Sequence, residues 1–116
     1  MKFLEIAMNV KNLFGVAAFG VAVIATNANA LATIGDRSCG QWSTRTQNPY
    51  EQIGSGNWLM GMMTGLAVGT SKDVLADTDG DSMMLWMDNY CRAHPLDRIG
   101  TAATVLYFEL LARKKQ

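Results

Sequence analysis

The sequence is poor in the residues on which many enzymes and metal sites depend. Its 116 residues include one histidine and two cysteines, and ten basic residues balance ten acidic ones. One histidine cannot form a typical zinc site, and a net charge of zero gives no electrostatic basis for binding nucleic acid. No Gly-x-Ser-x-Gly sequence, phosphate-binding loop or paired metal motif occurs. We therefore expect no enzyme, no metal, no cofactor and no nucleic-acid partner.

The N-terminal apolar run is too short to span a membrane and is typical of a secretory signal. Lys2 and Lys11 give a basic start, and residues 13–25 carry no charge. That run falls short of the roughly 20 residues that a membrane-spanning helix needs. The small-x-small sequence Ala28-Asn29-Ala30 then matches a signal peptidase site.

These features predict a signal peptide over residues 1–30, cleaved after Ala30, and a mature domain over residues 31–116. Translation could start at Met1 or at Met8, and a chain that starts at Met8 has the more typical basic region of a signal peptide. We expect a periplasmic or secreted product. It would contact a membrane only through the leader, if the leader stays uncleaved.

The two cysteines, Cys39 and Cys91, both lie in the mature part. An even number of cysteines in a small exported domain predicts a disulfide. This bond would close a loop of about 50 residues, which the chain-entropy model values at roughly 4 kcal/mol.

The first half of the mature chain predicts a loose arm, a short helix and a longer one. We expect the arm over residues 31–37 and the short helix over residues 39–46, begun by a capping box at Ser38 and ended by Asn48-Pro49. Residues 50–56 read as a loop from which Ile53 reaches the core. Asn57 is then the expected cap of an uncharged helix over residues 58–70.

That uncharged helix has a glycine at every fourth position, Gly61, Gly65 and Gly69. Glycine is about 1 kcal/mol less favourable than alanine inside a helix. A stripe of three therefore predicts that another helix packs closely against it, and the helix with Trp86 is the candidate. A membrane helix is the alternative, but the segment is short and contains Asn57 and Thr64.

The stretch from Asp77 to Pro95 predicts an acidic N-cap, an amphipathic helix and a proline stop. Thr78 or Asp79 is the expected cap, which explains the alternating aspartates better than a calcium loop does. Trp86 is expected at the centre of the domain. The predicted structural core comprises Trp42, Trp58, Trp86, Met87, Tyr90 and Leu106.

A last helix is predicted over residues 95–113, with Ile99, Ala102, Ala103, Leu106 and Leu110 facing inward. No strand-like alternation occurs in the chain. The predicted fold is therefore all-α: a compact bundle of one short and three longer helices with one disulfide, following the signal helix.

Two sequence segments together resemble small helical proteins of the bacterial envelope. One is Trp58-Leu59-Met60-Gly61-Met62-Met63-Thr64-Gly65, and the other runs from Trp86 through Cys91 to His94-Pro95. With the cysteine spacing, they are similar to type VI secretion immunity proteins of the Rap/Tai kind and to acid-stress chaperones of the HdeA/HdeB kind. The short basic tail departs from the chaperones. The absence of further cysteines departs from the immunity proteins.

The resemblance implies a protein-binding module of the immunity or inhibitor type, with an acid-activated periplasmic chaperone as the alternative. The expected partner is a toxin, a client or another envelope protein, and a homodimer stays open. Methionine side chains are flexible and suit binding surfaces. The candidate partner surface therefore comprises Met62, Met84 and His94.

Overall fold

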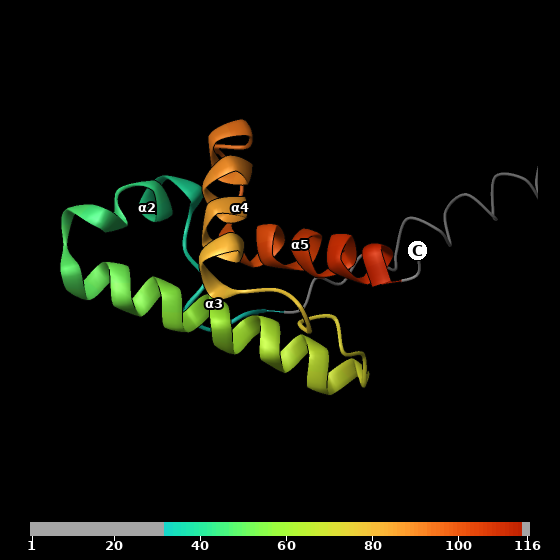
Figure 1. The fold of residues 1–116 in the computed structure, drawn as a ribbon. Helices are drawn as coiled ribbons and strands as arrows, with labels where there is room; N and C mark the ends of the chain where they lie inside the picture. Colours follow the sequence, from blue (N-terminus) through green and yellow to red (C-terminus); the bar gives the residue numbers. More distant parts are fainter. Residues whose placement is uncertain (1–31, 115–116) are drawn as a thin grey trace, which may run out of the picture. The chain divides into compact units, whose positions relative to one another are not determined.

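Helices make up most of residues 32–114, the part of the chain that the computed structural model describes (Figure 1). In order they are α2 (Cys39–Ser43), the 3-10 helix η1 (Arg45–Gln47), α3 (Pro49–Thr70), α4 (Gly80–Ala93) and α5 (Ile99–Lys114). No strand occurs among these residues, which confirms the all-α prediction of one short and three longer helices. The predicted signal peptide, its cleavage after Ala30 and the choice between Met1 and Met8 lie outside the described residues.

The disulfide between Cys39 and Cys91 is confirmed. It joins α2 to α4, with the two Cα atoms 5.0 Å apart, and both residues are buried. Around it lie residues from every α-helix, including Trp42 from α2, Met63 from α3 and Met87 from α4. The covalent link therefore passes through the core rather than across the surface.

The helix α2 begins where the capping box predicts. The Ser38 hydroxyl accepts from the Gln41 amide, and the Gln41 side chain accepts from the Ser38 amide, each at 3.1 Å. The helix then ends at Ser43 and continues as η1, so the predicted helix over residues 39–46 is confirmed in outline.

The start of α3 was predicted wrongly. The expected loop over residues 50–56 is helical, and the cap is Asn48, whose side chain accepts from the Tyr50 amide at 2.9 Å. Pro49 occupies the first turn, where its missing N–H is not needed. The Asn48-Pro49 pair therefore starts a helix instead of only ending one. Ile53 is 63% exposed and does not reach the core.

The helix α4 follows the prediction closely. Asp79 is the N-cap, its carboxylate accepting from the Ser82 amide at 2.7 Å, and the helix ends at Ala93 ahead of Pro95. Trp86, however, is only partly buried, because its indole N–H donates to Glu109 (2.7 Å) at the edge of the domain. Met87, which is fully buried, takes the central position predicted for Trp86.

The helix α5 begins at Ile99 rather than Pro95, and residues 95–98 form a turn. Its first amides are satisfied by the segment before α2: the Ile99 amide donates to the Arg37 carbonyl and the Gly100 amide to Asp36, each at 2.9 Å. The segment predicted as a loose arm is therefore tied to α5. The predicted inward residues of α5 are all buried.

Candidate protein-binding surface

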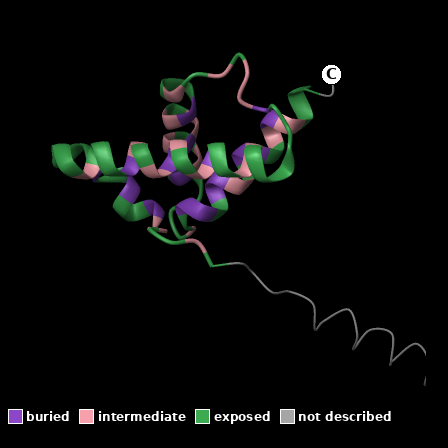
Figure 2. Cartoon of the chain, turned by 90° about the horizontal axis from the view of Figure 1, so that it is seen from below, coloured by how far each residue is buried: buried purple, intermediate pink, exposed green. Residues whose placement is uncertain are grey.

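The helix α3 has an inner side that packs on the domain and an outer side that packs on nothing in the described chain. Its buried residues Ser55, Leu59 and Met63 recur at four-residue steps and define the inner side. Figure 2, seen from below, shows that the opposite side of α3 is largely exposed. We call this side the outer face of α3. Its exposed members are Tyr50, Ile53, Gly54, Asn57, Gly61, Thr64, Gly65 and Val68.

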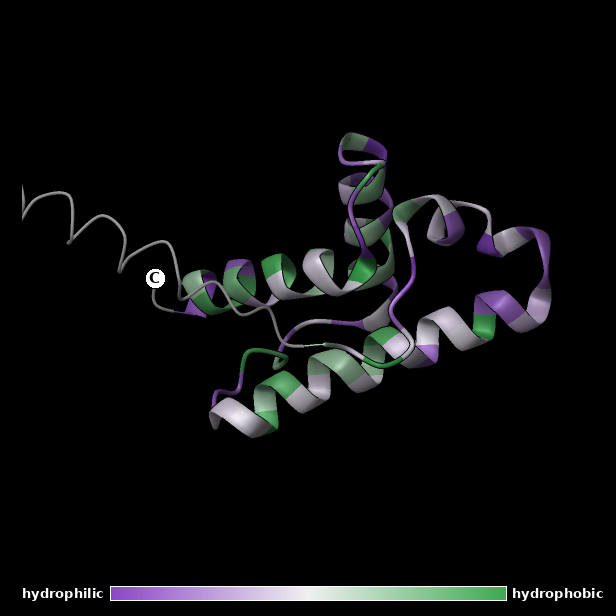
Figure 3. Cartoon of the chain, turned by 180° about the vertical axis from the view of Figure 1, so that it is seen from behind, coloured by the Kyte–Doolittle hydropathy of each residue, from purple (hydrophilic) through white to green (hydrophobic). Residues whose placement is uncertain are grey.

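The outer face of α3 is unusual because it is exposed and uncharged. No charged residue occurs between Glu51 and Lys72, and Figure 3 shows white and green colours along the C-terminal part of the helix. Tyr50 is 85% exposed and Val68 is 74% exposed. Exposed helix faces of monomeric proteins normally carry charged side chains. An extended surface without them is typical of a contact site.

The predicted packing at the glycine stripe is wrong within the described chain. A Cβ atom built on Gly61, Gly65 or Gly69 would meet no atom within 4 Å. Each residue thus carries the helix cost of glycine without a close neighbour inside the domain. Close approach occurs elsewhere: a Cβ on Gly35 would lie 2.8 Å from the Trp58 ring.

Contacts on the inner side and at the N-terminal half hold α3 in place. The Trp58 indole N–H donates to the Ile34 carbonyl at 2.8 Å, and Glu51 pairs with Arg37. Trp58 is therefore only partly buried, at the boundary between the predicted core and the surface. A face held this way loses little conformational freedom when it binds.

The residues predicted as a partner surface do not form one patch. Met62 on α3 and Met84 on α4 are partly buried against the core, and Met84 packs over Gly56. His94 is exposed, but its ring stacks on Tyr90 at 4.3 Å. Tyr90, a predicted core residue, is partly buried and donates to Asp97 at 2.6 Å. That hydrogen bond, with burial, raises the pKa of the Tyr90 hydroxyl.

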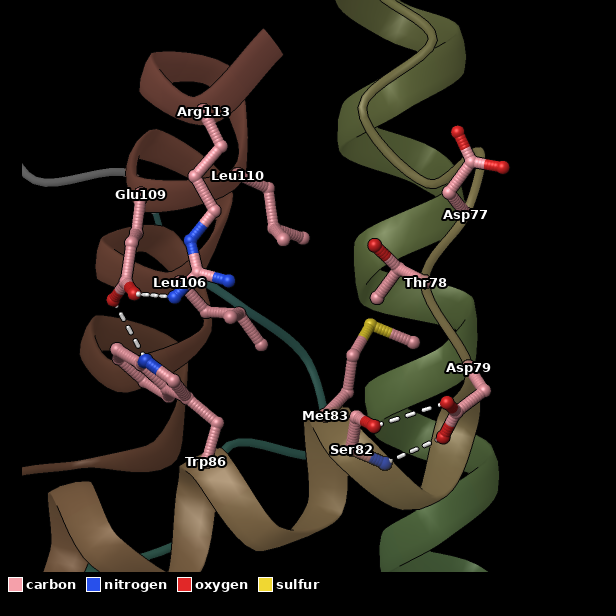
Figure 4. Close-up of a pocket in the computed structure, with 10 residues that line it drawn as sticks. All are labelled: Asp77, Thr78, Asp79, Ser82, Met83, Trp86, Leu106, Glu109, Leu110 and Arg113. Carbon is pink, nitrogen blue, oxygen red and sulfur yellow. Dashed lines mark hydrogen bonds and ion pairs between the residues drawn. The ribbon is translucent and has the colours of Figure 1, made fainter. Parts of the chain in front are cut away.

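A small hollow lies between α5, the first turns of α4 and the loop before it (Figure 4). Its volume is about 180 Å³, and Met83, Leu106 and Leu110 supply apolar lining. The carboxylate of Glu109 at its edge already accepts from Trp86 and Arg113, each at 2.7 Å. Glu109, and Asp79 as the cap of α4, are therefore engaged in structural contacts.

A partly buried ion pair between η1 and α4 was not predicted. The Arg45 guanidinium, 7% exposed, donates to both oxygens of Asp88 at 2.7 and 3.2 Å, and the Trp42 indole N–H donates to Asp88 at 2.8 Å. Arg45 also stacks on Trp42, 4.3 Å from the ring centroid. The need of a buried indole N–H for an acceptor was the available clue.

Two features of the described chain bear on ligands. Residues 32–114 contain no group of three or more His, Cys, Asp or Glu side chains that could hold a metal ion. Although α3 has 22 residues, none of the described helices combines the length and apolar character required to cross a bilayer. Comparison with family models, curated proteins and solved structures finds no match to this chain.

Proposed function

We propose that the protein is an exported, non-enzymatic protein-binding module, of the immunity or inhibitor type, and that it binds through the outer face of α3. The observation that carries this proposal is the uncharged, exposed surface of a 22-residue helix with three glycines at which an added Cβ would meet no other part of the described chain within 4 Å. Export to the periplasm or the medium is supported by the disulfide, because such bonds persist in oxidising compartments.

The chemistry of the outer face suits another polypeptide better than a small molecule. It places the glycine stripe beside the exposed side chains of Tyr50, Ile53 and Val68. Glycines allow a second backbone to come close, and aromatic residues are enriched at protein interfaces. A helix or strand of a partner would cover the glycine stripe and bury the side chains of Tyr50, Ile53 and Val68.

Photo-crosslinking in cells tests this function. A photoreactive residue replaces Thr64 on the outer face of α3 or, as a control, the exposed Ala112 on α5. We expect a defined protein adduct from position 64 and not from position 112. The adduct should disappear in the Gly61→Arg variant, because the arginine side chain covers the glycine stripe and blocks close contact. Equal adducts at both positions, or none at position 64, would contradict the proposal.

An acid-activated chaperone is the second candidate, favoured by the carboxylates that hold the domain together. Burial alone would raise the pKa of Asp36, but hydrogen bonds from Arg98 and Gly100 outweigh it and lower that pKa. Hydrogen bonds from the Ser82 amide and hydroxyl lower the pKa of Asp79. The stability that these contacts provide begins to fall below pH 3.8, the ordinary pKa of the unfolded chain, and is lost as the pH passes through the lower pKa values of the folded protein.

The two candidates separate in one assay. A chaperone holds an acid-labile client in solution at pH 2–3, and this activity should survive Gly61→Arg, because the unfolded apolar core would bind the client. Absence of holding activity at pH 2–3 eliminates the chaperone and leaves the outer face of α3 as the functional surface.

A further inference from the structure

We infer that the outer face of α3 binds the same face of a second copy of this chain, with the two helices antiparallel around a two-fold axis. This inference rests on the proposed function, since it names the partner of the proposed surface. It commits to self-association; a foreign protein on the same face is the alternative that the experiment below detects.

The spacing of the exposed residues is that of a helix-pairing seam. Along the middle of the outer face the positions advance by alternate steps of four and three residues, and all six are exposed. This is the seven-residue repeat by which two helices keep one seam in contact. The seam residues are Tyr50, Gly54, Asn57, Gly61, Thr64 and Val68.

The order of residues along the seam is self-complementary when the second helix runs in the opposite direction. With residue numbers that sum to 118, Gly54 meets Thr64 of the second copy, and Asn57 meets Gly61. Each of these layers joins a glycine to a larger side chain, and the outermost layers join Tyr50 to Val68. Side chains on one helix thus fill the gaps over the other, as close packing requires.

A parallel pairing lacks this fit. Every layer would then join a residue to the identical residue of the second copy. The layers of Gly54 and Gly61 would each leave a gap, and Tyr50 would meet Tyr50. Opposed helix dipoles also favour the antiparallel arrangement, because unlike ends lie side by side. Orientation is therefore a specific and testable part of the inference.

The charge pattern favours a second copy over a foreign protein. Beside the seam lie the uncharged residues Ile53, Met60 and Ala67 on one edge and Trp58 and Gly65 on the other. The second edge also carries Glu51 near the start of α3, and its carboxylate pairs with Arg37 of its own chain. A symmetric contact therefore brings no like charges together. The middle of the face offers a foreign partner no charge to pair with, so the pattern gives a second copy at least as good a fit.

The size of the surface sets the expected affinity. The seam from Tyr50 to Val68 runs about 27 Å at 1.5 Å per residue. About ten residues of each copy would take part, fewer than the roughly 20–30 per side of a standard interface. We therefore expect dissociation constants in the range of about 1–100 µM, because small interfaces leave little free energy after the cost of association.

Sedimentation equilibrium of the full exported protein, at about 5–500 µM, is the first measurement. We expect a monomer–dimer equilibrium, and at least tenfold weaker association for Gly61→Arg and for Thr64→Arg. Ala112→Arg, which adds the same charge elsewhere, should associate like the unsubstituted protein. Circular dichroism verifies that each variant is folded. A monomer at every concentration overturns the inference.

Orientation is measured with a nitroxide-bearing residue at Ser71, after the end of α3. The antiparallel register separates the two labels by about 36 Å along the axis, whereas a parallel pair holds them within about 20 Å. The short distance overturns the inference. In the crosslinking experiment at position 64, an adduct only to a foreign protein would overturn self-association and leave the proposed function standing. The absence of any adduct would overturn both self-association and the proposed function.

Discussion

At the scale of single residues, the domain is held by a few buried pairs and close contacts. The disulfide ties α2 to α4, and the ion pair of Arg45 and Asp88 ties η1 to α4 one helical turn before Cys91. Breaking a buried pair from one side leaves a charge without a partner, which is more destabilising than losing an exposed ion pair.

The first prediction is therefore that Asp88→Asn destabilises the protein by about 2–3 kcal/mol, less than for a fully enclosed pair because Asp88 is 34% exposed. The matched control is Asp73→Asn, which changes an exposed aspartate in the segment between α3 and α4. Urea unfolding measures both. A difference below about 0.5 kcal/mol between the two variants would show that Arg45 is satisfied without the charge.

Glycines in different surroundings give the second prediction. Gly61→Ala should stabilise the monomer by about 0.5–1 kcal/mol, since a Cβ there meets nothing and alanine is the better helix former. Gly35→Ala should destabilise it, because Gly35 has φ +79 and a Cβ would lie 2.8 Å from the Trp58 ring. Thermal unfolding of dilute protein should move in opposite directions for the two. A loss of stability in Gly61→Ala would mean that α3 has a neighbour within the chain.

At the scale of elements, the boundaries show what sequence patterns can and cannot give. The caps at Ser38 and Asp79 were predictable, because the capping side chain and the backbone N–H that donates to it lie three residues apart. The start of α5 was not, because its first amides are satisfied by Asp36 and Arg37, more than 60 residues earlier. Contacts at that distance depend on the assembled fold.

The composition of the outer face of α3 was predicted, but its exposure to solvent was not. The sequence revealed the glycine stripe and the absence of charge, yet periodicity alone did not say which side of the helix faces the core. The structure resolves this through Leu59 and Met63, which are buried opposite Gly61. The glycine stripe was therefore predicted correctly, but the helix that was expected to pack against it does not do so in the described chain.

Capping gives the third prediction, which distinguishes the observed start of α3 from the one predicted from sequence. Asn48→Ala removes the side chain that accepts from the Tyr50 amide and should cost about 1 kcal/mol. Asn57→Ala changes the residue that had been expected to cap the helix, and within α3 it should cost nothing in the monomer. Urea midpoints of the two variants are compared at low protein concentration, and the reverse order would place the helix start at residue 57.

The cap of α5 gives the fourth prediction, a pH dependence. The pKa of Asp36 is lower in the folded protein than the ordinary 3.8 of the unfolded chain. Its contribution is therefore complete above pH 3.8 and is lost as the pH falls through the folded value. Stability measured between pH 2 and pH 6 should fall less steeply with acid in Asp36→Asn than in the unsubstituted protein. Parallel curves would show that Asp36 does not couple proton binding to folding.

At the scale of the whole molecule, the disulfide between α2 and α4 and the ion pair between η1 and α4 hold together a small domain that leaves one side of the long helix α3 exposed. The disulfide closes a separation of 52 residues, worth roughly 4 kcal/mol in the chain-entropy model. The cysteine count revealed this link in advance, whereas the ion pair beside it emerged only from the fold. The domain is thus stabilised away from the outer face of α3, which stays available for contact.

The central claim, that the outer face of α3 is covered by protein in the cell, is tested most directly by carbene footprinting of living cells and of dilute purified protein. The internal control is Leu96, which is 96% exposed in the turn before α5. We predict that labelling of Tyr50 and Val68 falls at least fivefold in cells while labelling of Leu96 is unchanged. Equal labelling of Tyr50, Val68 and Leu96 in cells and in dilute solution would contradict the claim.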